Sequence, residues 1–105
     1  MLDSETFRRW VGHAVHDPSG ERVGGLVQVY VNGDGEPQWL VLNRRTMTAR
    51  TDLVPASAAT IGEAGLEVTV AASVIHDAPP VKDRHHLTGD EERALTEYYG
   101  IDAAR

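Results

Sequence analysis

Two turn signals on either side of one long apolar run constrain the fold of this chain more than any other feature. Residues 17–20 read Asp-Pro-Ser-Gly, the composition of a type I turn with Asp first, Pro second and Gly fourth. Residues 32–35 read Asn-Gly-Asp-Gly and supply residues that tolerate positive φ. The segment between them, residues 22–31, is rich in valine and has the composition of a strand. The pattern predicts that this part of the chain folds as connected antiparallel hairpins.

Strict alternation divides the predicted strand at residues 22–31 between two faces. One face carries the four alternating valines, Val23, Val27, Val29 and Val31. The opposite face carries the remaining large side chains, Arg22, Leu26, Gln28 and Tyr30. Two consecutive glycines, Gly24 and Gly25, interrupt the strand, and glycine at such a place predicts a bulge or a sharp bend.

Further segments have the pattern of short strands, namely residues 11–16, 39–42, 48–54 and 65–70. Residues 39–42 are apolar on both faces, which predicts that one face packs on something other than the main core. Residues 55–59 read as a short helical turn or a crossing connection. Five or six short strands with Gly-rich turns predict a mainly β fold, a small antiparallel barrel rather than an open sheet.

Helical segments are predicted at both ends of the chain. Ser4 has the chemistry of an N-cap for a short first helix, and Ser73 for a single turn that runs through Asp77. Residues 88–91 read Thr-Gly-Asp-Glu, a capping box, and predict a helix over residues 89–99 that ends at Gly100. We therefore divide the chain into a barrel domain, residues 1–80, and a linker with an amphipathic C-terminal helix, residues 81–105.

Charge and composition exclude several classes of function. The 105 residues carry a formal net charge of −6, which argues against binding to nucleic acid or to an anionic membrane surface. Cysteine is absent, so the sequence offers neither disulfides nor a thiolate nucleophile. The first ten residues lack the apolar core of a signal peptide, and no segment approaches transmembrane length. The expected location is the cytoplasm.

Taken together, the order and spacing of these segments resemble the PRC-barrel family over residues 7–80. The resemblance rests on the 17–24 turn and on the apolar runs around it, residues 11–12, 27–31, 37–42, 53–55 and 78–80. Residues 86–101 look like the C-terminal extension of small stand-alone bacterial members. The resemblance implies a compact β-barrel that serves as an assembly module and shares no catalytic residues across the family.

Two relatives of known role occur in the PRC-barrel family, and this sequence departs from both. One is the H subunit of the photosynthetic reaction centre, whose membrane anchor this sequence does not contain. The other is a ribosome-maturation factor that binds a ribosomal protein. That factor has a separate N-terminal barrel, which this sequence does not show. Gln28 also stands where relatives often have an acidic residue.

Candidate interaction residues are the aromatic side chains and one basic cluster. Aromatic residues are enriched at the centres of protein interfaces, and a small core also gains from burying them. Both readings stay open for Leu95 and the four aromatics, Trp10, Trp39, Tyr98 and Tyr99. Arg44, Arg45 and Arg50 form a basic cluster that either docks an acidic partner or an RNA backbone, or balances an acidic surface.

The five histidines do not form a metal-ligand pattern. His13 and His16 are three residues apart on a predicted strand and so face opposite sides, while His85 and His86 lie near Asp83 in a predicted loop. We therefore expect no metal, no cofactor and no catalytic site.

These observations predict a non-enzymatic protein-interaction module, self-associating as a homodimer. The expected contact is a helix-in-groove seam centred on Leu95, Tyr98 and Tyr99. The alternatives are a small-molecule or metal-binding sensor, and an accessory factor in ribosome assembly or RNA processing.

Overall fold

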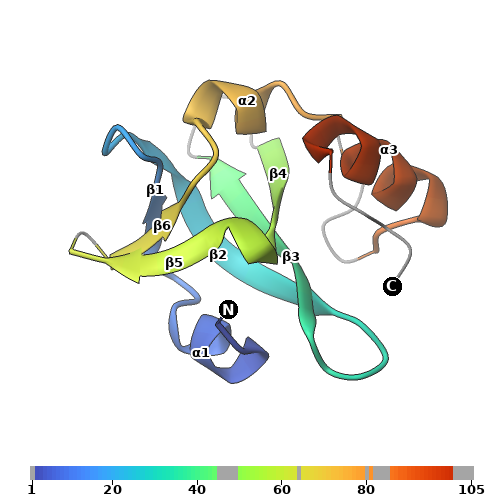
Figure 1. The fold of residues 1–105 in the computed structure, drawn as a ribbon, viewed down its shortest axis with the longest axis horizontal. Helices are drawn as coiled ribbons and strands as arrows, with labels where there is room; N and C mark the ends of the chain where they lie inside the picture. The colour runs from blue at the N-terminus through green and yellow to red at the C-terminus, as the bar shows by residue number, and fades with distance from the viewer. Residues whose placement is uncertain (1, 45–49, 64, 80, 82–85, 101–105) are drawn as a thin grey trace.

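Six strands form one sheet that carries three α-helices, in a computed structural model that describes residues 2–44, 50–63, 65–79, 81 and 86–100 (Figure 1). The strands are β1 (Ala14–His16), β2 (Arg22–Val31), β3 (Pro37–Arg44), β4 (Arg50–Pro55), β5 (Ala59–Gly62) and β6 (Gly65–Val68). The helices are α1 (Ser4–Arg9), α2 (Ala72–His76) and α3 (Gly89–Tyr99), and a 3-10 turn, η1 (Ala56–Ala58), joins β4 to β5. The molecule is therefore mainly β, as the sequence predicts.

The strand order in the sheet is β4-β3-β2-β1-β6-β5. Every neighbouring pair is antiparallel except β1 and β6, which run parallel with Val15 opposite Leu66. The expectation of a wholly antiparallel sheet is wrong at this pair, since β6 returns to lie beside β1 after four intervening strands. The edge strands are β4 and β5, and no pairing joins them within the described part of the chain.

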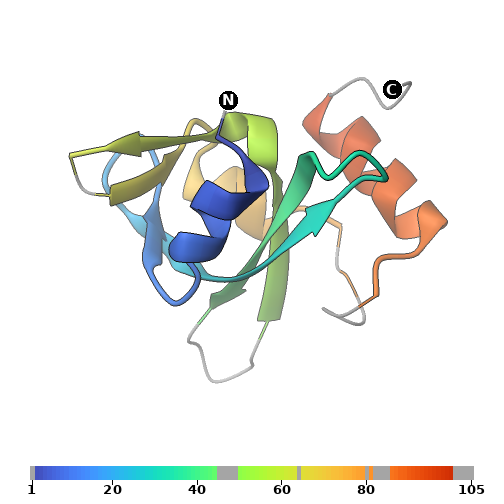
Figure 2. The ribbon, with the colours of Figure 1, turned by 90° about the horizontal axis from the view of Figure 1, so that it is seen from below.

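The sheet is strongly curved. In Figure 1 the ribbon of β5 crosses in front of β2, and the view from below in Figure 2 separates the two with α1 in front of them. Inside this curve lies the main core, which α1 and α2 help to close. Its largest side chains, all fully buried, are Phe7, Val15, Val23, Leu26, Leu40, Leu42, Val54, Leu66 and Ile75.

A second apolar cluster lies on the opposite face of β3 and β4. It contains Trp39, Val41 and Leu53 from the two strands, with Ala78 and Leu95 from the chain that follows. Strand β3 thus buries Leu40 and Leu42 on one side and Trp39 and Val41 on the other. The prediction that residues 39–42 pack on a second surface is confirmed, and the second surface is covered by α3.

The predicted faces of β2 are wrong because the strand is bulged twice. Val23 is an extra residue between the Val15–Gly24 and His16–Arg22 pairs with β1. Val27 is an extra residue between the Leu26–Leu42 and Gln28–Val41 pairs with β3. Each extra residue reverses the side-chain alternation. As a result Val23, Leu26 and Val29 pack on the main core, Val27 and Tyr30 pack on the second cluster, and Val31 is exposed.

Three local assignments also differ from the sequence analysis. The first predicted strand is shorter, since Gly12 has φ of +94° and β1 begins only at Ala14. Asp3, not Ser4, caps α1, with its Oδ1 accepting from the amide of Thr6 at 2.8 Å. Strand β5 follows η1 directly and was not identified from the sequence.

Candidate interaction surface

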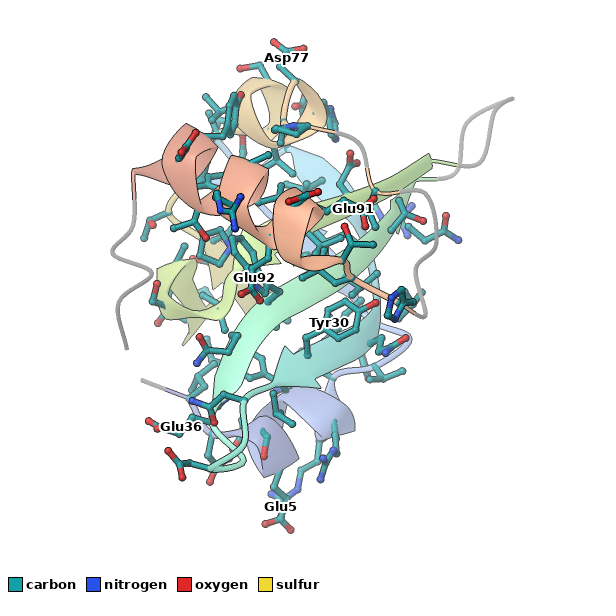
Figure 3. The ribbon with its side chains drawn as sticks, turned by 90° about the vertical axis from the view of Figure 1, so that its right-hand side faces the viewer. Glu5, Tyr30, Glu36, Asp77, Glu91 and Glu92 are labelled. Carbon is teal, nitrogen blue, oxygen red and sulfur yellow. The ribbon has the colours of Figure 1, made fainter. Side chains whose placement is uncertain are left out.

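Helix α3 covers an apolar surface that we call the outer face. It consists of Trp39, Val41 and Leu53 from β3 and β4, together with Ala78 from the chain after α2. Figure 3 views the molecule from this side, with α3 lying across the sheet and Glu91 and Glu92 on the helix. Leu95 points into the outer face and is fully buried. The side chains of Val27, Tyr30, Val81, Leu87 and Tyr99 pack around it.

Two adjacent tyrosines attach the C-terminal turn of α3 to the rest of the chain. The Tyr99 hydroxyl donates to the carbonyl oxygen of Leu53 on the edge strand β4, at 2.6 Å. The Tyr98 hydroxyl donates to the carbonyl oxygen of Val74 in α2, also at 2.6 Å. The Tyr99 ring lies 6.1 Å from that of Trp39 and 5.1 Å from that of Tyr98, within the range of favourable aromatic pairs. The tyrosines therefore fix α3 against both α2 and β4.

Burial raises the pKa of Tyr99 well above its usual value, and the nearby Tyr98 and Asp52 raise it further. The phenol consequently stays protonated through the physiological range and remains a hydrogen-bond donor. This matches its role, because only the protonated hydroxyl can donate to the Leu53 carbonyl.

Beside the attachment point lies an exposed apolar strip. Val74 is 41% exposed and Tyr98 is 39% exposed, and the hydrogen bond between them makes them neighbours. We call this pair, one residue from α2 and one from α3, the α2–α3 strip. It presents aromatic and branched aliphatic surface at the point where the two helices meet.

The other aromatic candidates lie elsewhere. Trp39 is 3% exposed and fills the second cluster, so within the chain it acts as a core residue. Trp10 is half-buried and its ring stands edge-on to that of His13, 5.1 Å away. It also packs on Gly65, where an added Cβ would come within 3.1 Å of the ring. Trp10 therefore belongs to the α1–β1 connection and does not adjoin the outer face.

The basic cluster is only partly placed by the structure. Arg44 ends β3 and Arg50 begins β4, and the two are backbone partners in the register of the sheet. Arg45 lies outside the described residues.

A site that sequence reasoning assigned only to a turn is Asp17, which is 6% exposed. Its Oδ1 accepts from the Ser19 hydroxyl at 2.7 Å, from the Glu21 amide at 2.9 Å and from the Ser19 amide at 3.0 Å. Its Oδ2 accepts from the amide of Ala72, the first residue of α2, at 2.9 Å. These bonds, first that of the Ser19 hydroxyl and then that of Ala72, lower the pKa of Asp17 to about 2.

Asp17 therefore supplies the N-terminal cap of α2 from a distant hairpin. The expected cap, Ser73, lies inside the helix, and the actual N-cap residue, Ala71, makes no side-chain bond. This tie positions α2, and with it Val74, beside the outer face. The sequence signal, Asp-Pro-Ser-Gly, identified the turn but not the partner 55 residues away.

The histidines are dispersed. His13 and His86 are exposed, while the His76 Nε2 lies 3.2 Å from the carbonyl oxygen of Val23. Asp83 and His85 fall outside the described residues. Across the residues that the structure describes, no group of three or more His, Asp or Glu side chains could hold a metal ion.

In the same described residues, no helix combines the length and the apolarity needed to cross a membrane. Comparison of the sequence with models of known protein families gave no match, and comparison with curated proteins gave none either.

Proposed function

We propose that this protein is a non-enzymatic interaction module that associates with a second copy of itself through the region of α3. The observation that carries the proposal is the α2–α3 strip, where Val74 and Tyr98 leave apolar surface exposed side by side. Tyrosine at the centre of a contact contributes strongly to binding, because it buries a large ring and still satisfies its hydroxyl. In this chain the Tyr98 hydroxyl already donates to the Val74 carbonyl, so a partner would not need to supply an acceptor for it.

We also propose that the sheet belongs to the PRC-barrel type. The strong curvature, the bulged second strand and the 17–20 turn support this assignment. In a barrel of this kind the two edge strands, β4 and β5, would approach each other, and η1 already connects them. An experimental structure with hydrogen bonds between β4 and β5 would support barrel closure, and two separate edges would contradict it.

Replacing both residues of the α2–α3 strip tests the proposed interface. We expect the Val74→Ala/Tyr98→Ala double variant to lose self-association, because it removes the exposed apolar atoms but leaves Leu95 and Tyr99 in place. The measurement is mass by light scattering after size exclusion, against 11.4 kDa for one chain. Ile61→Ala is the matched control, since Ile61 is 44% exposed on the distant strand β5 and should leave the mass unchanged. A dimer that persists in the double variant would remove the strip from the interface.

A further inference from the structure

The two turns that flank β2 share one hydrogen-bond pattern. In each turn a side-chain oxygen of the first residue accepts from the backbone amides of the third and fifth residues. Asp17 does so at 3.0 and 2.9 Å in residues 17–21, and Asn32 does so at 2.9 and 3.0 Å in residues 32–36. The fourth residue of each turn is a glycine with positive φ, Gly20 at +88° and Gly35 at +80°. The chain therefore builds the same turn twice, once on a carboxylate and once on a carboxamide.

The two donors on Asn32 identify the orientation of its carboxamide and activate it. Both donors are backbone amides, those of Asp34 and Glu36, so the atom that they share is Oδ1, the acceptor of the side chain. Paired amides at 2.9 and 3.0 Å from an oxygen have the geometry of an oxyanion hole, which stabilises negative charge as a carbonyl carbon is attacked. The Asn32 Cγ is therefore a favourable target for a nucleophile.

The neighbouring nucleophile along the chain is the backbone nitrogen of Gly33. Its attack on the Asn32 Cγ is intramolecular, so the two reacting atoms are held close by the chain itself. Gly33 is exposed, and a Cβ built on it would meet no atom within 4 Å. Among the described residues the Gly33 amide donates no hydrogen bond, whereas the Gly35 amide donates to the Asn32 carbonyl at 3.0 Å. The nitrogen that would have to lose its proton is thus one that the turn does not use.

The first turn lacks this reactivity although its geometry is the same. Pro18 stands in the position of Gly33, and its nitrogen carries no proton to lose. Asp17 also presents a charged carboxylate, which resists attack by a nucleophile more than a neutral amide does. The first turn therefore serves as an unreactive counterpart of the second. It also shows that an acid side chain is accepted at the first position of the turn.

We propose that Asn32 is a site of spontaneous deamidation in the folded protein. The Gly33 nitrogen gives up its proton to solvent and bonds to the Asn32 Cγ, and the Cγ–Nδ2 bond breaks. The departing amino group takes up a proton and leaves as ammonia, so that a succinimide remains. Water then opens this ring at one of its two carbonyls. Opening at Cγ gives aspartate, and opening at the main-chain carbonyl gives isoaspartate.

The two products should affect the turn differently. Aspartate keeps an acceptor in place for the amides of Asp34 and Glu36, because Asp17 makes the same two bonds in the first turn. Isoaspartate makes Cγ part of the main chain, which lengthens the turn between β2 and β3 and moves the accepting oxygen. Both products add a negative charge to a chain whose formal net charge is already −6.

Peptide mass mapping of the full native chain tests the proposal. The chain is incubated for days in mildly alkaline buffer, and fragmentation spectra locate each exchange of an amide for an acid and separate aspartate from isoaspartate. We expect exchange at Asn32 and none at Asn43, which is paired inside the sheet with Gly25 and Thr51 and is followed by Arg44. The same chain in denaturant shows how fast the reaction runs without the fold.

A proline in the second turn is the matched variant. Gly33→Pro copies Pro18, removes the attacking N–H and should abolish exchange at Asn32 while the fold is kept. Gly33→Ala is a milder second variant that should slow the exchange by about tenfold or more, because a Cβ at this position hinders the approach of the nitrogen. Asn32→Asp supplies the fully converted chain as a reference for charge. Far-ultraviolet circular dichroism checks that each variant keeps its sheet.

The outcomes decide the proposal independently of the self-association proposed above. Exchange at Asn32 in the native chain, abolished in Gly33→Pro and slowed in Gly33→Ala, supports it. A native chain that keeps Asn32 intact while the denatured chain converts it overturns the proposal, because the fold then protects the site. Exchange that continues in Gly33→Pro also overturns it, because that variant cannot form the ring.

Discussion

At the scale of single residues, Asp17 connects sequence positions that no local pattern links. Its folded pKa of about 2 lies below the ordinary value of 3.8 because four hydrogen bonds favour the charged carboxylate. A lowered folded pKa means that the stabilisation is present above about pH 4 and is lost as the pH falls toward 2.

We therefore expect Asp17→Asn to lower the melting temperature at pH 7 by roughly 5 °C or more and to flatten its decline between pH 4 and 2. The measurement is thermal unfolding followed by circular dichroism at pH values from 2 to 7. Asp34 is an exposed carboxylate of the second turn and serves as the control. Because Asp34→Asn leaves Asp17 in place, its melting temperature should still fall between pH 4 and 2 as in the native chain. If the melting temperature of Asp17→Asn matched that of the native chain at every pH, the hydrogen bond from Asp17 to α2 would not stabilise the protein.

The raised pKa of Tyr99 leads to a prediction at high pH. Burial raises its pKa above the usual value of 10, so the native state holds this proton more tightly than the unfolded state does. The stabilisation from the protonated phenol is therefore complete below about pH 10 and is lost as the pH rises further.

We expect Tyr99→Phe to cost about 1 kcal/mol at pH 7, since it removes the donor to Leu53. In ultraviolet titration the native chain should show a tyrosine ionisation step well above pH 10, and this late step should disappear in Tyr99→Phe. A late step that persists in the variant would assign it to another tyrosine.

At the scale of elements, the outer face depends on one side chain of α3. Leu95→Ala removes the fully buried side chain that packs in one cluster with Trp39 and Leu53, and should cost about 2–5 kcal/mol. Chemical denaturation measures the change, and Glu97→Ala on the same helix should stay within about 0.5 kcal/mol of the native chain. Equal effects of the two substitutions would mean that α3 does not rest on the outer face in solution.

The elements predicted correctly from the sequence are those whose determinants are local. Helix α3 follows from the capping box at Thr88 and from Gly100, and the two-faced burial of β3 follows from its unbroken apolar run. The faces of β2 could not be read from alternation, because bulges at Val23 and Val27 reverse it. The cap of α2 was missed because its acceptor, Asp17, is distant in sequence.

The candidate site was predictable only in part, for the same reason. The residue types were identified, but the sequence does not say which of them face inward. Leu95 and Trp39 turn out to meet each other inside the chain, while Tyr98 and Val74 meet at the surface. Val74 was not a candidate, and a short helix with one outward valine gives no signal that would have identified it.

At the scale of the whole molecule, two apolar clusters share one sheet, and the smaller one is closed by a segment at the end of the described chain. This arrangement lets a small protein bury additional apolar surface, but the burial of the second cluster then depends on one short helix, α3. It also places the covered outer face next to the exposed α2–α3 strip, so the surface proposed for self-association adjoins a surface that the fold itself depends on.

The mass of the full native chain in solution tests the proposed self-association most directly. Light scattering from about 1 to 500 µM should show the mass rising from that of one chain, 11.4 kDa, to twice that value. A mass that stays at 11.4 kDa across the whole range would contradict the account.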